Sequence, residues 1–376
     1  MYVQRSMYKQ LSKEKQLVYL LAKTKLNKEE IFELKELLST HLDWSKVIGL
    51  IQFHRIAGSA YSNIKTYINE IKGFKYPYFL KLITIMYKAQ KQISLEQYKY
   101  ILEICEILHA NNIKYAVLKG IALAQCAYGD IGMRISNDFD ILIHPNDTNQ
   151  VLKILKEIGY VQGTYDYHKK EIVLANRREV VTLPLISHQT YPLVKKVDEN
   201  HQFLEYFSVD VHFSVDLMTN NRTDKVVEDF LNRGKKVVIQ GKEVCTLDRE
   251  DMLIFTCMHF YKDAIYESEV LNYKDLLLYK ICDIYRLIIN DDDKEINWNE
   301  ITQRVVKYKL QKPLYYALYY TNDLFEVIPE EILSAFEQQP KQYLNQIINK
   351  GSVVGQWEDN ILDRVFNITR PQNWIK

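Results

Sequence analysis

The stretch RISNDFDILI, residues 134–143, decides how the middle of this 376-residue chain folds. It places two carboxylates, Asp138 and Asp140, one residue apart, and the β-branched run that follows is typical of a buried strand. In a strand, residues two apart point to the same face. Like charges held together at the edge of a core repel each other and lose solvation, so the pair predicts that something cationic binds there.

The residue type of the pair favours a divalent metal. Mg²⁺ prefers oxygen ligands, commonly takes one or two carboxylates, and completes its shell with water and substrate phosphates. The DxD pattern also arises by chance, and in that alternative Asp138 caps a turn while Asp140 lies on the surface. The residues on either side of the pair bear on this choice.

Upstream, IKYAVLKG (113–120) predicts a short strand that ends at Gly120, and helical spacing resumes in IALAQCAYGD (121–130). A strand, a glycine and a helix in this order present backbone N–H groups and a helix N-terminus, which suit phosphate. Lys119 adds a positive charge, and Arg134 could reach either phosphate or the carboxylates.

Downstream, FSVDVHFSV (207–215) predicts a second alternating strand, with Asp210 and His212 on one face and apolar residues on the other. A third carboxylate on an adjacent strand could complete a site for two metals. Two metals would stabilise both the attacking and the leaving oxygen of a phosphoryl displacement. Asp216 is the next candidate for the third acid.

These segments together resemble a known family. The pattern LKG–aLa–Y–R–D-x-D-hydrophobic, present in YAVLKGIALAQCAYGDIGMRISNDFDILI (115–143), resembles that of the uncharacterised nucleotidyltransferase family within the DNA polymerase β-like nucleotidyltransferase superfamily. SVDVHF (208–213) looks like the D-x-H-aromatic segment of that family. The resemblance covers roughly residues 40–290 and extends to FHRIAGSAYSNI (53–64), MHFYKD (258–263) and LYKICDIYRLI (278–288).

The resemblance implies an α+β fold, in which a polymerase β-like core of mixed sheet and helices is flanked by N- and C-terminal helical segments. It also implies that Asp138, Asp140 and Asp210 are both the catalytic acids and the metal ligands, holding two Mg²⁺ or Mn²⁺ ions. Where the wider superfamily usually has Gly-Ser in its turn, this chain has Lys-Gly. The residues expected to contact the nucleotide are Lys119, Gly120, Arg134 and Ser136.

Four further residues are candidates for substrate contact in the cleft: His212, His259, Lys280 and Asp283. His259 lies in an apolar helix, where a satisfied core histidine is the alternative. Lys280 and Asp283 are three apart on one helix face, where the alternative is a surface ion pair. His188 falls on an expected strand near Asp210 and is left without a role. The sequence has no GxSxG, Walker A or GxGxxG motif.

Helical periodicity fills residues 8–110, including a helix with Asp43 as N-cap and a stretch, 76–112, that forms either one helix or two. The middle predicts a helix within 146–160 capped by Asp147 or Thr148. Antiparallel strands are expected in 171–175, 179–194 and 205–216, and a hairpin around Gln240-Gly241. After 248 the pattern is helical almost to the end. The predicted domains are 1–110, 111–247 and 248–376.

Composition limits the classes of function. The formal net charge is +1, which gives no argument for long nucleic acid as a partner. Five cysteines, an odd number without zinc spacing, are expected to be reduced and mostly buried in the cytoplasm. The polar N-terminus has no signal core, and no run of 18 apolar residues predicts a membrane span.

The combined prediction is a metal-dependent nucleotidyltransferase that moves NMP from an NTP to an acceptor hydroxyl and releases pyrophosphate. The NTP is expected in a cleft between the α/β core and the C-terminal helices. A small-molecule acceptor such as an aminoglycoside-like sugar is favoured, while a protein side chain and an RNA 3′ end stay open. The alternatives are a catalytically weak or inactive nucleotide-binding or interaction protein, and a toxin–antitoxin-like enzyme that modifies protein or RNA.

Overall fold

The computed structural model describes residues 7–71, 73–198, 200–218, 222–289 and 295–369. The chain divides into two compact units, which are described separately. Unit 1 comprises residues 1–88, 256–298 and 310–376, and unit 2 comprises residues 89–255 and 299–309. The three domains predicted from the sequence stay a proposal, and their outer ends, 1–6 and 370–376, lie outside the described residues.

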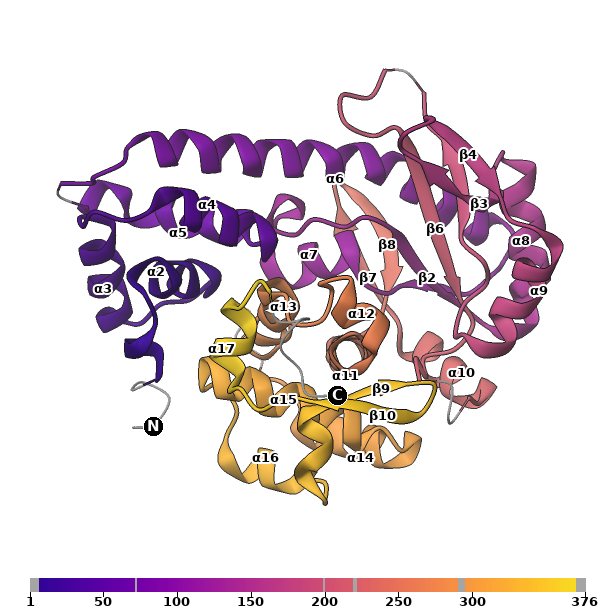
Figure 1. The fold of residues 1–376 in the computed structure, drawn as a ribbon. Helices are drawn as coiled ribbons and strands as arrows, with labels where there is room; N and C mark the ends of the chain where they lie inside the picture. The colour runs from indigo at the N-terminus through magenta and orange to yellow at the C-terminus, as the bar shows by residue number, and fades with distance from the viewer. Residues whose placement is uncertain (1–6, 72, 199, 219–221, 290–294, 370–376) are drawn as a thin grey trace. The chain divides into compact units, whose positions relative to one another are not determined.

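Unit 2 is an α+β domain built on one eight-stranded sheet (Figure 1). Its strands are β1 (Tyr115–Val117), β2 (Phe139–Ile143), β3 (Val161–Asp166), β4 (Glu171–Leu174), β5 (Leu193–Lys196), β6 (Tyr206–His212), β7 (Lys235–Ile239) and β8 (Lys242–Thr246). Its helices are α7 (Gly120–Tyr128), η2 (Ile131–Met133), η3 (Pro145–Asp147), α8 (Thr148–Glu157), α9 (Arg177–Ile186), α10 (Asp224–Arg233) and most of α14 (Trp298–Tyr308).

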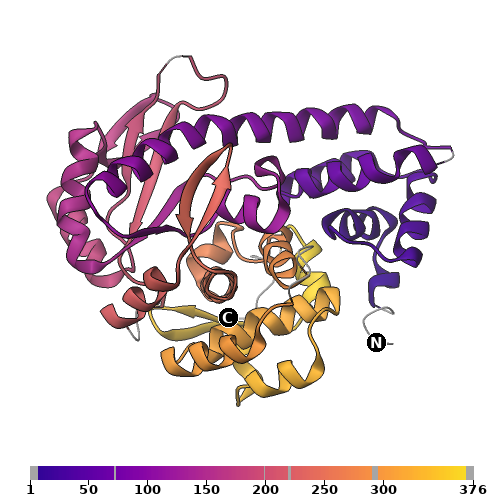
Figure 2. The same ribbon diagram turned by 180° about the vertical axis from the view of Figure 1, so that it is seen from behind.

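The sheet has the order β4-β3-β5-β6-β2-β1-β8-β7 and is mixed (Figure 2). β2 and β6 pair in parallel at its centre, with Asp140 opposite Asp210, although 70 positions separate these residues in the sequence. β1 joins β2 in antiparallel and β8 in parallel orientation. The remaining ladders, including β5 on β6, are antiparallel. This topology places carboxylates from two distant segments side by side.

Alternation along β6 separates a core face from a polar face. Phe207, Val209 and Val211 are buried in the main apolar cluster of unit 2, together with residues of α6 (Tyr78–Ala110) and α8. The intervening Ser208 and Asp210 point the other way, because successive strand residues alternate between faces. The apolar face therefore fixes the register that aligns the acids.

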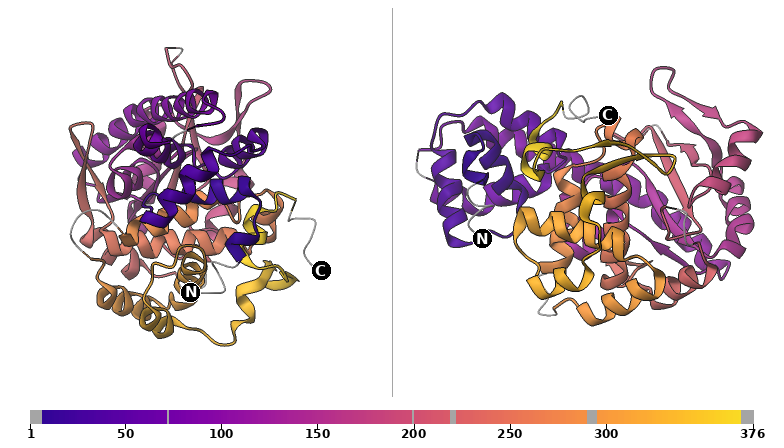
Figure 3. Two further views of the ribbon diagram at one scale, coloured as in Figure 1. Left: turned by 90° about the vertical axis from the view of Figure 1, so that its left-hand side faces the viewer. Right: turned by 60° about the horizontal axis from the view of Figure 1, so that its bottom comes forward.

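Unit 1 is mainly helical, and two helices, α6 (Tyr78–Ala110) and α11 (Arg249–Ile265), belong partly to each unit. Its helices are α2 (Lys13–Ala22), α3 (Lys28–Leu38), α4 (Trp44–Phe53), α5 (Ala57–Tyr67), η1 (Ile68–Glu70), α12 (Glu267–Leu271), α13 (Leu278–Ile289), α15 (Gln311–Phe325), α16 (Glu330–Phe336), η4 (Lys341–Asn345) and α17 (Ile361–Phe366). A small hairpin, β9 (Gln346–Asn349) and β10 (Ser352–Gln356), is seen best when the C-terminal part comes forward (Figure 3).

Several local predictions are confirmed. Residues 78–110 form one continuous helix, which ends before Asn112 at a positive φ of 56°. The Asp43 side chain caps α4 by accepting from the backbone N–H of Ser45 and of Lys46. Gln240 and Gly241, with φ of 48° and 80°, form the two-residue turn between β7 and β8.

The strand expected in residues 179–194 is wrong over residues 179–186, which belong to α9 (Arg177–Ile186). A capping box starts this helix: the Asn176 side chain accepts from the Glu179 N–H, and the Glu179 side chain accepts from the Asn176 N–H. These reciprocal bonds overcome the β-branched composition of the segment, and Pro184 is tolerated inside the helix. β3, which the sequence did not indicate, forms a hairpin with β4, and both strands precede α9 in the chain.

Two further expectations are wrong in detail. The C-terminal part is not helical throughout, because Lys350 and Gly351, with φ of 48° and 81°, turn the chain between β9 and β10. Asp147 is the N-cap residue of α8, as predicted, but its side chain makes no capping hydrogen bond, and the Thr148 hydroxyl donates to the Pro145 carbonyl. No helix among the described residues is long and apolar enough to span a membrane.

Candidate active site

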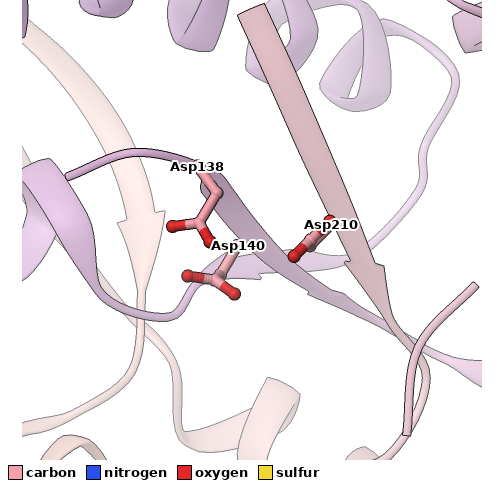
Figure 4. A group of neighbouring side chains, drawn as sticks. All are labelled: Asp138, Asp140 and Asp210. Carbon is pink, nitrogen blue, oxygen red and sulfur yellow. The ribbon is translucent and has the colours of Figure 1, made fainter. Parts of the chain in front are cut away.

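Three aspartates converge at the centre of the sheet in unit 2 (Figure 4). Asp138 comes directly before β2, Asp140 lies on β2, and Asp210 lies opposite it on β6. One carboxylate oxygen from each lies within 4.8 Å of the others, so that a single ion could touch all three. Asp140 is buried, Asp210 is half-buried and Asp138 is exposed. The alternative that placed Asp140 on the surface is therefore wrong.

The three carboxylates disturb one another's protonation. Desolvation, followed by the charges of Asp140 and Asp138, raises the pKa of Asp210 to about 7, although a hydrogen bond with Gln189 and the charge of Lys119 act in the opposite direction. Desolvation among surrounding protein atoms and the charge of Asp140 also raise the pKa of Asp138, even though solvent reaches this residue. Three anions at this distance call for a compensating cation.

Two basic side chains hold the carboxylate of Asp140. Lys119 Nζ lies 3.0 Å from its Oδ2, and His212 Nε2 lies 2.8 Å from its Oδ1. Burial by itself would lower the pKa of Lys119, but the charges of Asp140 and Asp138 outweigh burial and the net shift is upward. Lys119 is thus held as a cation beside the acids, in the turn between β1 and α7.

The turn between β1 and α7 requires glycine. Gly120 has φ of +57°, and a Cβ added there would lie 3.2 Å from Ser136 Oγ. That hydroxyl donates to the backbone carbonyl of Asp138 over 2.9 Å, and the side chain of Gln97 donates to the carbonyl of Ser136. The turn, Ser136 and the first acid therefore form one connected structure.

Arg134 is 9 % exposed and comes directly after η2. The positive charge of Arg134 acts against the upward pKa shifts of Asp138 and Lys119, so its guanidinium is within electrostatic range of the acids. The preceding loop is fixed by a hydrogen bond from Gln90 to the Gly132 carbonyl and by the Asp130 carboxylate, which accepts from the Gly132 N–H.

Some contributors to the site carry no signal in the sequence. Gln189 hydrogen-bonds to Asp210, and it reaches β6 through an isolated bridge to His212. His188 is part of the same short segment rather than of a strand: its ring lies 5.0 Å from that of His212, and its carbonyl accepts from the Phe213 N–H. These contacts depend on tertiary pairing.

The other predicted residues divide between the two units. His212 is 1 % exposed and lies beside Asp140, so it reaches the acids and not solvent. His259, Lys280 and Asp283 lie in unit 1, where Lys280 pairs with Asp263 and His259 Nδ1 lies 3.3 Å from the same carboxylate. Lys280 and Asp283 are 5 % and 1 % exposed, so the surface ion pair is wrong.

Asp216 is not one of the three acids that meet. It is 6 % exposed, and its carboxylate accepts from the Met218 N–H over 3.0 Å, as in a local turn. Among the described residues, the group that could hold a metal consists of Asp138, Asp140 and Asp210. An all-carboxylate oxygen donor set fits Mg²⁺ or Mn²⁺ better than softer metals.

Comparisons with known proteins address the family. No curated protein matches the sequence. Among solved structures, the chain is similar to an antigenic nucleotidyltransferase-like protein from Paracoccidioides brasiliensis, with 18 % sequence identity and a TM-score of 0.35 over 64 % of this chain and 93 % of that chain. A family model described as "Uncharacterised nucleotidyltransferase" matches residues 40–326 of the 376. The protein therefore belongs to this uncharacterised nucleotidyltransferase family.

Proposed function

We propose that the protein is a metal-dependent nucleotidyltransferase, which transfers NMP from an NTP to an acceptor hydroxyl and releases pyrophosphate. The observation that carries this proposal is the convergence of Asp138, Asp140 and Asp210 within 4.8 Å, in a chain that belongs to a nucleotidyltransferase family. The five cysteines, none of them in a disulfide, are consistent with a reducing cytoplasmic location.

In this proposal Asp138, Asp140 and Asp210 would hold the metal. When bound, Mg²⁺ supplies charge neutralisation for the phosphates and for the attacking and leaving oxygens. The side chain of Lys119 moves from Asp140 to the β- and γ-phosphates as a nucleotide enters, because a phosphate offers it a stronger negative charge. The turn at Gly120 gives those phosphates backbone N–H groups, and Arg134 adds a second cation.

Asp210 is assigned mainly to the acceptor. Its raised pKa, about 7, is that of a group able to accept a proton near neutral pH. Ser136 keeps Asp138 and the turn in register through its bond to the Asp138 carbonyl. Positioning and charge neutralisation then account for the chemistry, and no covalent enzyme intermediate is needed.

The test is incubation of the purified full-length protein with ATP, GTP, CTP or UTP and Mg²⁺, followed by mass measurement of the protein and of candidate acceptors. Thermal stabilisation by each NTP is measured in parallel with Mg²⁺ and with EDTA. Equal stabilisation in EDTA for every NTP would rule out the metal site. Metal-dependent binding without any pyrophosphate release would instead support the catalytically inactive, nucleotide-binding alternative.

A further inference from the structure

Three tyrosines form an aromatic cluster on the unit 2 sheet, here called the tyrosine platform: Tyr165, Tyr167 and Tyr206. The rings of Tyr165 and Tyr206 are stacked with centroids 4.5 Å apart. Tyr167 meets both rings edge-on, at 5.4 and 5.6 Å, and its hydroxyl lies 2.7 Å from that of Tyr206. Tyr167 is 64 % exposed, so the cluster presents aromatic surface to solvent.

The platform shares a sheet face with the acids. Tyr206, Ser208 and Asp210 alternate along β6 and therefore point to one side. Tyr165 lies over this same side, because its ring stacks on that of Tyr206. The β2–β6 register pairs Phe139 with Val209, and one residue further along it sets Asp138 opposite Ser208. Tyr206 lies two residues before Ser208 on the same strand, a backbone distance of roughly 7 Å.

The platform lies on one side of the acids, and the turn at Lys119 and Gly120 lies on the other. In the sheet order, β3 and β5 lie beyond β6, whereas β1, which leads into Lys119 and Gly120, lies beyond β2. Figure 1 shows β3 and β4 on the β6 side of the sheet, and β5 lies between β3 and β6. If the triphosphate occupies the turn, the tyrosine platform is on the side left for the acceptor.

Charges of both signs surround the platform. Residues 161–206, which carry all three tyrosines, contain six Lys/Arg and six Asp/Glu. The Glu205 carboxylate accepts a hydrogen bond from the Tyr165 hydroxyl and lies 3.4 Å from Lys170 Nζ. Lys196 is exposed and lies directly opposite Tyr206 in the β5–β6 ladder. Arg177 and Arg178, at the start of α9, are exposed as well. Stacked aromatic rings beside exposed cations such as Lys196 are a common means of binding single-stranded nucleic acid.

We propose that the tyrosine platform binds the acceptor, and that the acceptor is the 3′ end of a single-stranded nucleic acid, with a terminal base against the rings and backbone phosphates near Lys196. This inference rests on the proposed function. In the reaction, the acceptor 3′-oxygen forms a bond to the α-phosphorus of the NTP, and its proton passes to Asp210. The bond from the α-phosphorus to the bridging oxygen breaks, and pyrophosphate leaves with that electron pair.

Binding is tested apart from catalysis, in EDTA and without NTP. The anisotropy of a fluorescein-labelled single-stranded hexanucleotide, as RNA and as DNA, is titrated with the full-length protein. Tyr167→Ala should weaken binding at least about fivefold, the lower end of what one base–aromatic stack contributes. Tyr167→Phe should bind like the wild type. Phe32→Ala is the matched control, because Phe32 is 67 % exposed on α3 in unit 1.

Transfer is tested with α-labelled NTPs, Mg²⁺ and four acceptors: the hexanucleotide, the same strand with a 3′-phosphate, a mononucleotide and an amino sugar. The inference expects label on the hexanucleotide with a free 3′-hydroxyl, and less on the mononucleotide. Label on the amino sugar alone, or oligonucleotide binding unchanged in Tyr167→Ala, overturns the inference and leaves the proposed function standing. Absence of metal-dependent NTP binding overturns the proposed function itself.

Discussion

His212 Nε2 lies 2.8 Å from Oδ1 of Asp140, and the two residues are 1 % and 5 % exposed on the paired strands β6 and β2. Because Lys119 occupies the other carboxylate oxygen, Asp140 is held on both sides. If a nucleotide draws Lys119 away, as proposed above, the contact with His212 keeps this carboxylate oriented. Loss of a side chain that hydrogen-bonds to a metal-ligating residue and fixes its orientation typically lowers metal affinity about 10- to 100-fold.

His212→Phe keeps the ring volume and removes the hydrogen bond to Asp140. We expect Mn²⁺ affinity to fall by about 10- to 100-fold, because the carboxylate is no longer fixed. His212→Gln, which retains an N–H donor, should recover part of the loss. Calorimetric titration with Mn²⁺ measures both variants, with thermal unfolding as the check on folding. Wild-type affinity in His212→Phe would show that Asp140 needs no such support.

The acids are expected to separate into two roles. Asp138→Asn and Asp140→Asn should lose both metal-dependent NTP binding and turnover, because these residues hold the metal. Asp210→Asn should keep much of the NTP affinity and lose turnover, since Asp210 serves the acceptor hydroxyl. Titration calorimetry of NTP with Mg²⁺ beside a pyrophosphate-release assay distinguishes the two patterns. Normal turnover in Asp210→Asn would remove it from the catalytic group.

Lys119 and Arg134 are expected to act on the triphosphate. Alanine at either position should weaken NTP binding more than NMP binding, with a difference of about 1.5–3 kcal/mol for a lost charge-assisted hydrogen bond. Lys153→Ala, a 77 % exposed lysine on α8, is the control for a general change in charge. Equal losses for NTP and NMP would place both side chains away from the β- and γ-phosphates.

Gly120→Ala tests the turn against a matched glycine. Gly120 and Gly129 both have positive φ, 57° and 69°, but an added Cβ meets Ser136 only at Gly120. Each variant should lose about 1–2 kcal/mol of stability from backbone strain alone. Gly120→Ala should in addition weaken NTP binding, while Gly129→Ala should not. Urea unfolding and NTP titration give the two quantities, and equal NTP affinity in both variants would contradict a phosphate role for the turn.

Asp229 on α10 gives a pH-dependent prediction. Burial would raise its pKa, but hydrogen bonds from Lys307, Tyr308 and Lys225 outweigh burial and lower the pKa from 3.8 to about 2. An acid with a lowered pKa in the folded state stabilises fully above pH 3.8, and this stabilisation is lost as the pH falls towards 2.

Asp229→Asn should therefore be less stable than the wild type at neutral pH, and the difference should shrink between pH 4 and pH 2. Urea midpoints measured across this range test the prediction. Glu157→Gln, at a carboxylate with 62 % exposure, is the control. A constant difference between wild type and Asp229→Asn at every pH would mean that the charge of Asp229 does not stabilise the fold.

The centre of the site could be predicted because its determinants are local. The spacing of Asp138 and Asp140 in a strand, the β-type run before Gly120 and the alternation around Asp210 each follow from short-range pattern. The family resemblance then supplied the pairing of the two strands, which spacing alone does not give.

Two parts of the chain were predicted less well, for different physical reasons. Between β2 and β6, a capping box at Asn176 and Glu179 starts a helix in a β-branched stretch whose alternation favours strand, so a local signal outweighs the periodicity. On α13, the burial of Lys280 depends on Asp263, seventeen residues away and on another helix, and no helical spacing indicates that contact. Only this second case was decided by a tertiary partner.

Because β2 pairs directly with β6, the alignment of Asp140 with Asp210 does not depend on β3, β4 or α9, which lie outside that ladder. Of the intervening chain, β5 pairs with β6 and Gln189 hydrogen-bonds to Asp210. Insertions, deletions or exchange of β3, β4 and α9 would alter the aromatic surface while leaving that pairing in place. Relatives built on the same centre could therefore diverge in the molecules they modify while conserving one chemistry, and chimaeras that swap residues 161–186 would be a practical route to new specificity.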